Sequence, residues 1–317
     1  MRATGRRGAG RSLPGRPGRT LAGQRGQPAE PGQAHAVPGH GAARQGPHDH
    51  RRGSRGLRGD GLIVLAWFRL AAHLLRFSLR FLLVTLWVIF GLIVLATVFR
   101  RFEVARRDRI NNWWSRWLLR WCGVDVYVSG HPPVDGAALL IANHVSWLDI
   151  YALSSVRCTI FVGKQELRSW PVLGWLIAGV GTVFIERGNR RALHHVAQAM
   201  RERFDRGQLI GLFPEGTTSD GFDVLPFHAA LFEPARRAGV PVVPVALRYL
   251  QHGQRTAVAA YVGEETLLGN AWRVLGSTGM AVQVVYLPAV AADGGDEDHR
   301  HAMAARVREA IRAEVVV

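Results

Sequence analysis

The sequence predicts an α/β fold, a mixed sheet flanked by helices, with membrane-associated helices ahead of it. From about Asp125 onward, short apolar runs alternate with amphipathic helical stretches, which is the pattern of a sheet covered by helices. Ahead of that region, the 19 residues from Phe81 to Phe99 carry no charge. At helical rise such a run extends about 28 Å, close to the thickness of a hydrocarbon core. With 317 residues, 48% of them hydrophobic, the chain can also bury a substantial core.

Residues 1–60 differ in composition from the rest of the chain. They contain no Phe, Trp or Tyr and are rich in Gly, Pro and Arg, so they cannot bury enough apolar surface to fold, and we expect a disordered tail. Twelve arginines against three acidic residues give this tail +9 of the net charge of +16. A basic tail can bind phosphates, but without aromatic side chains to stack on bases we expect no specific nucleic acid partner. No secretory signal pattern is recognised at its start.

The membrane-associated region is predicted over residues 61–107. The run 81–99 reads as a membrane helix, with a buried core helix as the alternative. The preceding stretch 62–79 suits a helix in the membrane interface, or one that pairs with 81–99 as a shallow helical hairpin. Four side chains at spacings of four, three and four would form one polar stripe that reaches toward lipid headgroups: Arg69, His73, Arg76 and Arg80.

A third amphipathic helix is predicted around residues 109–121. On a helical wheel its apolar side chains fill one arc and its arginines another. The apolar arc either lies at the membrane interface, which tryptophan favours, or faces the protein core. The apolar residues are Trp113, Trp114, Trp117, Leu118 and Trp121, and the arginines are Arg109, Arg116 and Arg120.

The third predicted part of the chain is a globular domain over residues 108–317. Its two cysteines, Cys122 and Cys158, predict neither a disulfide framework nor a metal site, which fits a reducing compartment. Strands are predicted near residues 125–128, 138–142, 159–162, 182–185, 209–213, 242–247, 257–261 and 282–287. Helices are predicted at 147–153, 171–179, 192–206, 229–237 and 300–314.

A histidine and an aspartate follow the predicted strand 138–142. On one continuous helix, His144 and Asp149 would point about 140° apart and would not meet. They can meet if His144 lies in the turn and Asp149 in the first helical turn, with Ser146 as N-cap. The carboxylate would then fix the imidazole tautomer and leave the other ring nitrogen to take a proton from a hydroxyl. The same residues also fit an ordinary helix start with a capping box.

Three more segments carry candidate site residues. Residues 181–191 place several arginines, among them Arg187, between a strand and a helix start, where guanidinium groups can hold phosphate. In residues 213–221, Gly216 and Gly221 allow backbone amides to approach a ligand, and Glu215 could hold a hydroxyl or orient a cation. The alternative for this segment is a plain hydrophilic turn. The run 240–247 contains two prolines, which favour an edge strand, and it could wall an acyl-chain channel.

In this order and spacing, the four segments resemble the glycerolipid acyltransferase family, and more narrowly the bacterial 1-acylglycerol-3-phosphate acyltransferases. The resemblance covers roughly Arg120 to Leu250, and its specific part is His-x4-Asp with the later Pro-Glu-Gly-Thr. It implies a glycerolipid acyltransferase-like mixed sheet anchored by an N-terminal membrane helical hairpin. It further implies a bacterial inner-membrane enzyme whose active site faces the cytoplasm, with acyl-CoA or acyl-carrier protein as donor, a lysolipid acceptor and no cofactor or metal.

The resemblance also implies roles for particular residues. His144 would be the general base and Asp149 would orient it. Arg187, helped by Lys164, would bind an acceptor phosphate. The product of acyl transfer to the free hydroxyl of 1-acylglycerol-3-phosphate would be phosphatidic acid, formed without a covalent intermediate. The full set of implied acceptor-binding residues is Asn143, Lys164, Arg187, Glu215, Gly216 and Thr217.

One departure keeps a second acceptor open. Phosphate-reading members often read Pro-Glu-Gly-Thr-Arg-Ser, whereas this chain has Thr218 in place of that arginine and Asp220 shortly after it. This version is similar to relatives that acylate lyso-ornithine lipid, whose headgroup carries a cationic amine. The arginines near 187 favour a phosphate, so lysophosphatidic acid is the first expectation. Two other classes stay open: a hydrolase, although no Gly-x-Ser-x-Gly elbow is present, and a non-enzymatic membrane-attached nucleic-acid binder.

Overall fold

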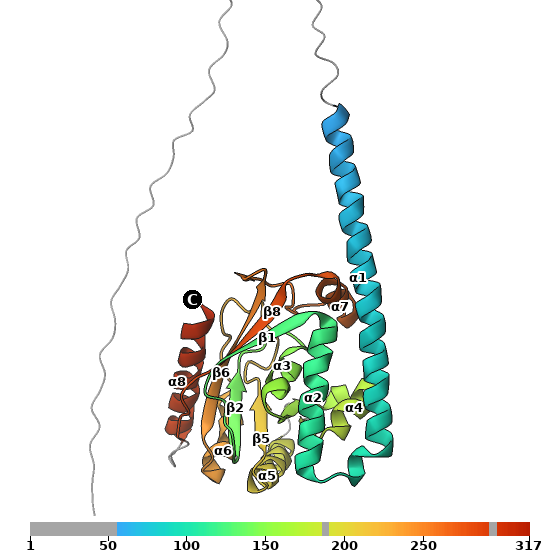
Figure 1. Ribbon diagram of the computed structural model, residues 1–317. Coiled ribbons are helices and arrows are strands. Elements are labelled where there is room, and N and C mark those ends of the chain that lie inside the picture. Colours follow the sequence, from blue (N-terminus) through green and yellow to red (C-terminus); the bar gives the residue numbers. More distant parts are fainter. Residues whose placement is uncertain (1–55, 186–189, 292–296) are drawn as a thin grey trace, which may run out of the picture. The chain divides into compact units, whose positions relative to one another are not determined.

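An eight-stranded mixed sheet forms the centre of the structure, a computed structural model that describes residues 56–185, 190–291 and 297–317 (Figure 1). The strand order is β1-β8-β6-β2-β5-β3-β4, with the short β7 paired to β6. All neighbouring strands are parallel except β6 with β8 and β6 with β7. The strands are β1 (Val124–Gly130), β2 (Ala138–Ala142), β3 (Thr159–Lys164), β4 (Val183–Ile185), β5 (Leu209–Leu212), β6 (Val242–Gln251), β7 (Gln254–Arg255) and β8 (Met280–Tyr286).

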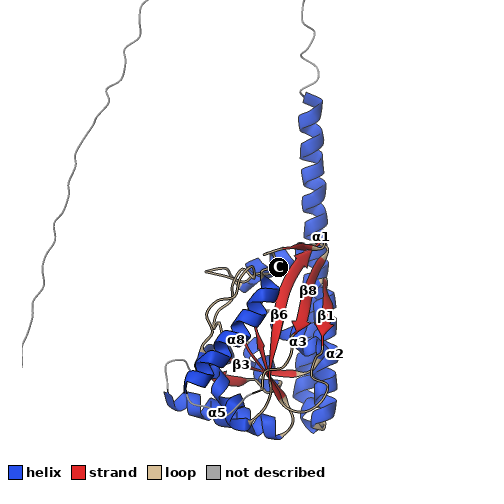
Figure 2. Cartoon of the chain, turned by 90° about the vertical axis from the view of Figure 1, so that its left-hand side faces the viewer, coloured by secondary structure: helices blue, strands red, loops and turns tan. Residues whose placement is uncertain are grey.

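Helices cover both faces of this sheet (Figures 1 and 2). The sheet divides the core into two layers. Along β2, alternation points Leu140 and Ala142 to one face and Leu139 and Ile141 to the other. The first face carries α2 (Val104–Cys122), α3 (Asp149–Val156) and α7 (Leu267–Gly276). The second carries α5 (Arg190–Asp205), α6 (Glu233–Ala238) and α8 (Glu297–Val315). The remaining elements are α1 (Gly56–Thr97), α4 (Leu173–Gly179) and the 3-10 helices η1 (Phe99–Arg101), η2 (Gln165–Ser169) and η3 (Ala229–Phe232).

The predicted mixed α/β class is confirmed, and two element predictions in the C-terminal half need correction. The strand expected at 257–261 is wrong: this segment forms turns, closed by a bond from the Ala260 amide to the Ala257 carbonyl of 2.9 Å. Helix α7 follows it and was not predicted, because Gly269 weakens its helical pattern. Its start is set by Thr266, whose hydroxyl accepts from the Gly269 amide at 3.1 Å.

Strand β6 lies inside the sheet, so the expected edge position of the Val-Pro run is wrong. Pro244 pairs with Ile141 of β2 on one side. On its other side the β8 ladder begins only at the next residue, where Val245 pairs with Tyr286. The Pro244 carbonyl accepts from the Leu287 amide at 3.0 Å. Proline is tolerated here because its missing N–H falls where that ladder ends.

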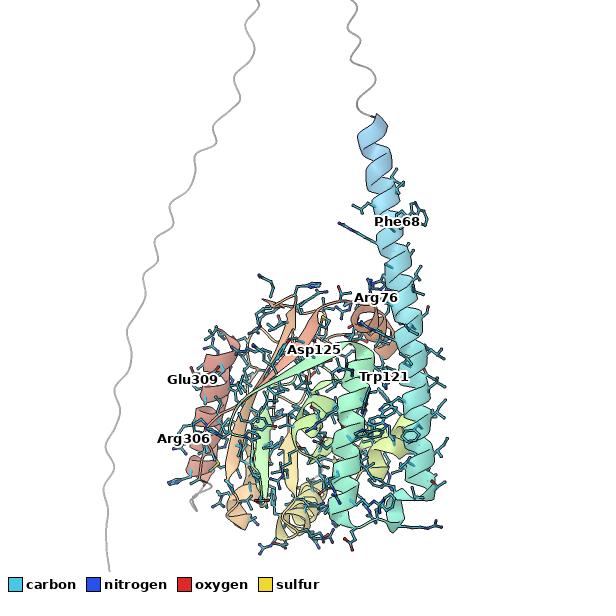
Figure 3. The ribbon with its side chains drawn as sticks, viewed as in Figure 1. Phe68, Arg76, Trp121, Asp125, Arg306 and Glu309 are labelled. Atoms are coloured by element: carbon cyan, nitrogen blue, oxygen red, sulfur yellow. The ribbon has the colours of Figure 1, made fainter. Side chains whose placement is uncertain are left out.

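Helix α1 is one continuous helix, so the shallow hairpin expected between residues 62–79 and 81–99 is wrong. Its segment Ile63–Thr97 is 35 residues long and, within the described residues, is the one helix long and apolar enough to cross a membrane. At helical rise it is roughly 50 Å long, which exceeds a hydrocarbon core of about 30 Å. Its large apolar side chains are widely exposed, Phe68 by 71% and Ile93 by 56%. Figure 3 shows Phe68 on the part of α1 that extends beyond the sheet. These features indicate membrane association.

The chain turns back only after α1, and α2 then packs against it. The predicted boundary between residues 107 and 108 therefore falls inside α2. The tryptophan arc of α2 gathers around Trp87 of α1: its ring centroid lies 5.0 Å from that of Trp113 and 6.4 Å from that of Trp114. The Trp87 indole N–H donates to the Trp114 carbonyl at 3.1 Å. The arc thus serves mainly helix packing, although Trp113 remains 45% exposed.

Three of the four residues in the polar stripe of α1 contact α7 or the residue after it, contrary to the expectation that the stripe reaches toward headgroups. Arg80 donates to the carbonyls of Leu275 and Ser277 at 3.1 and 2.6 Å, and Arg76 donates to Gly276 at 3.1 Å. The His73 ring lies 4.6 Å from that of Trp272. Cations at the last carbonyls of a helix stabilise it, so these contacts clamp α1 to α7.

We expect Arg80→Met to destabilise the protein, because it leaves two carbonyls at the end of α7 without their charged donor. The expected loss in the free energy of unfolding is about 1–3 kcal/mol. Thermal unfolding of the detergent-solubilised protein would measure it. Arg69→Met, on an exposed position of the same helix, is the matched control. Equal unfolding midpoints for the two variants would contradict a stabilising clamp.

Candidate active site

Two loops that leave the carboxyl ends of neighbouring parallel strands form the candidate site. The first follows β2 and carries His144, and the second follows β5 and carries Glu215. The loops are joined by backbone, since the Ser219 amide donates to the His144 carbonyl at 2.8 Å. Carboxyl ends of adjacent parallel strands are where α/β folds commonly place ligand sites.

His144 and Asp149 meet in the geometry expected from their spacing. The His144 Nδ1 and the Asp149 Oδ2 are 2.8 Å apart, with the histidine side chain 21% exposed and the aspartate fully buried. Helix α3 begins at Asp149, and its N-cap is Leu148 without a side-chain bond, so Ser146 is not the N-cap. Because an ionised carboxylate only accepts, Nδ1 carries the proton and Nε2 keeps its lone pair. That arrangement suits a general base.

The Asp149 carboxylate is held by neutral donors on both oxygens. Besides His144, Oδ2 accepts from the backbone amides of Val145 at 2.7 Å and Ser146 at 2.9 Å. Its Oδ1 accepts from the hydroxyl of Tyr249 in β6 at 2.7 Å. Four donors compensate for the burial of this charge.

Glu215 braces the two loops against each other. Its Oε1 accepts from the His144 amide at 2.8 Å and its Oε2 from the Leu225 amide at 3.2 Å. Desolvation raises the pKa of this carboxyl to about 7, although the two amide bonds work against that shift. Both Glu215 oxygens therefore accept hydrogen bonds from within the protein, and Glu215 supports the His144 backbone.

The face of the imidazole is fixed by an aromatic stack. Its centroid lies 4.1 Å from that of the Phe213 ring, with 13° between the planes. Phe213 in turn stacks on Phe161 of β3 at 5.6 Å. The hydrogen bond to Asp149 and this stack together leave the His144 ring little freedom, as preorganised catalysis requires.

Comparisons with known proteins decide the family of this chain. The sequence profile described as Acyltransferase matches residues 123–248. A 1-acyl-sn-glycerol-3-phosphate acyltransferase of Neisseria gonorrhoeae is 43% identical over 187 residues, which cover 58% of this chain and 71% of that protein. The chain belongs to this acyltransferase family. It is therefore an enzyme of glycerolipid acyl transfer.

Two further matches add to this picture of the acyltransferase. A lyso-ornithine lipid O-acyltransferase of Pseudomonas aeruginosa is 36% identical over 206 residues, covering 65% of this chain and 78% of that protein. The crystal structure of the 1-acyl-sn-glycerophosphate acyltransferase PlsC from Thermotoga maritima matches with a TM-score of 0.61 at 22% identity. That match covers 78% of this chain and 96% of the other, and it supports the fold.

Besides the glutamate already described, five acceptor-binding residues were predicted for the acyltransferase. Thr217 is exposed within the second site loop, and Gly216 before it takes a positive φ of 73°. Lys164 is exposed at the carboxyl end of β3, the strand next to β5. Arg187 lies outside the described residues. Asn143 is fully buried, and both ends of its amide bond the Leu247 backbone at 3.0 and 2.8 Å. Asn143 therefore ties the His144 loop to β6 and does not present its side chain to an acceptor.

Two residues of this site escaped sequence analysis. The sequence pattern did not single out Tyr249, because it lies in an apolar strand. Alternation along that strand places its side chain on the same face as Leu247, among buried apolar side chains. Phe213 is the first residue of the segment 213–221, where it was given no role. A polar group inside an apolar alternation was the signal available for Tyr249.

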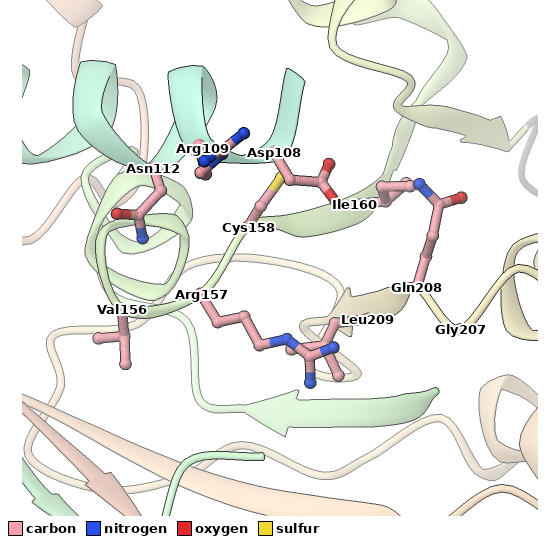
Figure 4. Close-up of a pocket in the computed structure, with 10 residues that line it drawn as sticks. All are labelled: Asp108, Arg109, Asn112, Val156, Arg157, Cys158, Ile160, Gly207, Gln208 and Leu209. Carbon is pink, nitrogen blue, oxygen red and sulfur yellow. The ribbon is translucent and has the colours of Figure 1, made fainter. Parts of the chain in front are cut away.

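A cavity of about 280 Å³ lies at the other end of the sheet (Figure 4). Its walls include Cys158 and Leu209, which stand at the amino ends of β3 and β5, whereas His144 and Glu215 follow the carboxyl ends of β2 and β5. Burial raises the pKa of the Cys158 thiol to about 12, so it stays protonated. This cavity is therefore separate from the candidate site of the acyltransferase.

The raised pKa of Glu215 predicts a pH-dependent stability. The folded carboxyl keeps its proton up to about pH 7, whereas the unfolded chain releases it near the usual value of 4.5. The stability this provides is complete below about pH 4.5 and is lost as the pH rises through 7. We expect the unfolding midpoint to fall between pH 5 and 8, and Glu215→Gln to flatten that fall. Glu264→Gln, at an exposed position, is the control, and a Glu215→Gln curve parallel to wild type would contradict the assignment.

Proposed function

We propose that this acyltransferase moves a fatty acyl group from acyl-CoA or acyl-carrier protein to the free hydroxyl of 1-acylglycerol-3-phosphate, giving phosphatidic acid. The observation that carries the chemistry is the 2.8 Å contact between His144 Nδ1 and Asp149 Oδ2, which leaves Nε2 as the base. The acceptor is suggested by the relative of 43% identity, which is named a 1-acyl-sn-glycerol-3-phosphate acyltransferase.

In the proposed reaction, Nε2 of His144 takes the proton of the acceptor hydroxyl as its oxygen attacks the thioester carbonyl. The new C–O ester bond forms, the C–S bond breaks, and the imidazolium returns the proton to the leaving thiolate. Asp149 stabilises the imidazolium while it exists. Since the hydroxyl attacks directly in a ternary complex, the mechanism uses no covalent enzyme intermediate, and no metal or organic cofactor takes part.

Acceptor recognition is proposed to involve residues in and next to the two site loops. Arg187, with the exposed Lys164 as helper, would hold a phosphate through charge-assisted hydrogen bonds. Gly216 and the exposed Thr217 would shape the space beside His144, while Glu215 would keep the loops in place.

Lyso-ornithine lipid is the second candidate acceptor, and two features of the second site loop favour it. Thr218, which stands where phosphate-reading relatives often carry arginine, donates its hydroxyl to the Tyr261 carbonyl and so is used inside the protein. The exposed Asp220 nearby adds a carboxylate, which suits a cationic headgroup better than a phosphate. The Pseudomonas aeruginosa relative carries that activity in its name.

An acceptor comparison tests the proposal. Purified, detergent-solubilised enzyme would receive a labelled fatty acyl-CoA, and in parallel acylated carrier protein, with lysophosphatidic acid or lyso-ornithine lipid as acceptor. We expect labelled phosphatidic acid, with a raised acceptor KM in Arg187→Ala. Product from lyso-ornithine lipid alone would replace the first candidate by the second, and free fatty acid without acylated lipid would indicate a hydrolase.

We also propose that α1 holds the enzyme at the bacterial inner membrane with the active site on the cytoplasmic side. The exposed apolar surface of α1 and the bacterial relatives support this location. A cysteine replacing Val134, which is 83% exposed on the globular domain, would report the orientation. An impermeant maleimide should label it in inverted vesicles and not in spheroplasts, and the reverse pattern would overturn the orientation.

A further inference from the structure

Tyr249 places a hydroxyl deep inside the apolar layer beneath the candidate site. It lies in the C-terminal part of the long interior strand β6, and only 2% of it is exposed. Alternation along the strand puts it in one cluster with Val245 and Leu247, among side chains of α2, α3 and α7. Its hydroxyl donates to the Asp149 Oδ1 at 2.7 Å. A buried tyrosine needs a partner for its O–H, and here that partner is the carboxylate that also binds His144.

The other donors to Asp149 come from its own loop. His144, Val145 and Ser146 all bind Oδ2. Among the ion pairs found between described residues, Asp149 forms one with His144 and none with a lysine or arginine. Tyr249 is therefore the contact that ties this carboxylate to strand β6 of the sheet.

We propose that Tyr249 is a positioning residue for acyl transfer, which holds the Asp149 carboxylate in the orientation that serves His144. The inference rests on the proposed function of His144 as the base. With Oδ1 fixed by Tyr249, rotation of the carboxylate about its Cβ–Cγ bond is blocked, and Oδ2 stays in line with the imidazole. The hydrogen bond from this hydroxyl also stabilises the negative charge on a carboxylate that is fully buried.

Loss of that hydroxyl changes the base in a predictable direction. With Oδ1 unpaired, the carboxylate attracts the imidazole proton more strongly, so His144 is free to act as base only at higher pH. Burial and the nearby Asp149 raise the pKa of Tyr249, so in the enzyme it remains a neutral donor throughout the working pH range. Two other ionisable groups face this pair. One is Cys122 of α2, where burial raises the pKa of the thiol to about 12, and the other is Glu215, which titrates near pH 7.

The structure offers a matched control for Tyr249→Phe in the neighbouring strand. Tyr286 of β8 is 3% exposed, pairs in register with Val245 of β6, and has a buried hydroxyl with no hydrogen-bond partner among the described residues. Tyr286→Phe removes the same atom from the same sheet without touching Asp149. Glu215→Gln is run beside them to identify any part of the pH profile that belongs to Glu215.

The test measures kcat, acceptor KM and the pH profile of kcat for the full-length, detergent-solubilised variants with acyl-CoA and lysophosphatidic acid, or lyso-ornithine lipid if only that is used. For Tyr249→Phe we expect kcat to fall roughly 10- to 100-fold, the range of a hydrogen bond to a charged group. Acceptor KM should stay unchanged and the acidic limb of the profile should move to higher pH, while Tyr286→Phe behaves as wild type.

Three results would overturn the inference: a wild-type kcat in Tyr249→Phe, a fall in kcat with an unmoved acidic limb, or an equal fall in Tyr286→Phe. The second and third would assign Tyr249 a role in packing alone, which unfolding midpoints of both variants would show. His144→Ala, assayed in the same series, separates the two proposals. An active His144→Ala overturns the proposed base itself, whereas an inactive one beside a wild-type Tyr249→Phe overturns only the positioning role.

Discussion

Replacing His144 with alanine is expected to lower acyl transfer by roughly two to four orders of magnitude while the protein stays folded and membrane-bound. The imidazole is the group whose Nε2 is free to take the acceptor proton, because its Nδ1 is used by Asp149 at 2.8 Å. The alanine side chain cannot take a proton, and the hydroxyl must then attack unassisted. Turnover of purified variant with labelled acyl-CoA measures the effect.

The control for this variant is His131→Ala, which removes an exposed histidine after β1. It should leave turnover unchanged. Because the ring of His144 also stacks on Phe213, unfolding midpoints of both variants must be compared. Near-normal turnover in a folded His144→Ala would rule out the general base role.

The second large effect is expected for Asp149→Asn, at about a factor of 10² to 10⁴ in kcat. Three donors face the Asp149 Oδ2, so the amide oxygen of asparagine takes that position and its N–H₂ faces the Tyr249 hydroxyl. The neutral amide then cannot stabilise the imidazolium that forms when His144 takes the acceptor proton. The amide also offers only one acceptor oxygen, whereas Asp149 accepts on both of its oxygens. Some loss of stability should therefore accompany the loss of rate.

Asp125→Asn in β1, at an exposed position, provides the control for charge removal (Figure 3). The measurement is kcat together with the unfolding midpoint. If Asp149→Asn kept more than about a tenth of the wild-type kcat, the role of the Asp149 charge in supporting the base would be overturned.

Local pattern was sufficient to predict much of the sheet and the His144/Asp149 contact. Residues 138–142 form a strand as expected, because a short apolar run bounded by a turn has few alternatives. The His-x4-Asp spacing could be tested against helix geometry, which excludes a continuous helix and leaves a turn followed by a helix start. That reasoning needs only residues close in sequence.

The errors concern contacts between distant segments. Arg76 and Arg80 bind carbonyls about 200 positions later in the chain, and no periodicity within α1 indicates that α7 will lie beside it. Tyr249 likewise acquires its partner across 100 residues. Pro244 was assigned to an edge strand because the pattern of its own segment does not show where the ladder between β6 and β8 begins. That point depends on the length of β8. Propensity rules describe a residue, whereas these positions are set by the topology.

The clamp between α1 and α7 limits how this enzyme can be shortened. A protein that starts at α2 would lose the guanidinium groups that hold the end of α7, together with the rings that cover Trp272, among them Phe77 at 4.6 Å. It would also uncover the tryptophans that pack on Trp87. Removing the apolar helix to gain solubility would therefore expose a new, aggregation-prone apolar surface. Detergent or lipid discs are the better route to a well-behaved sample.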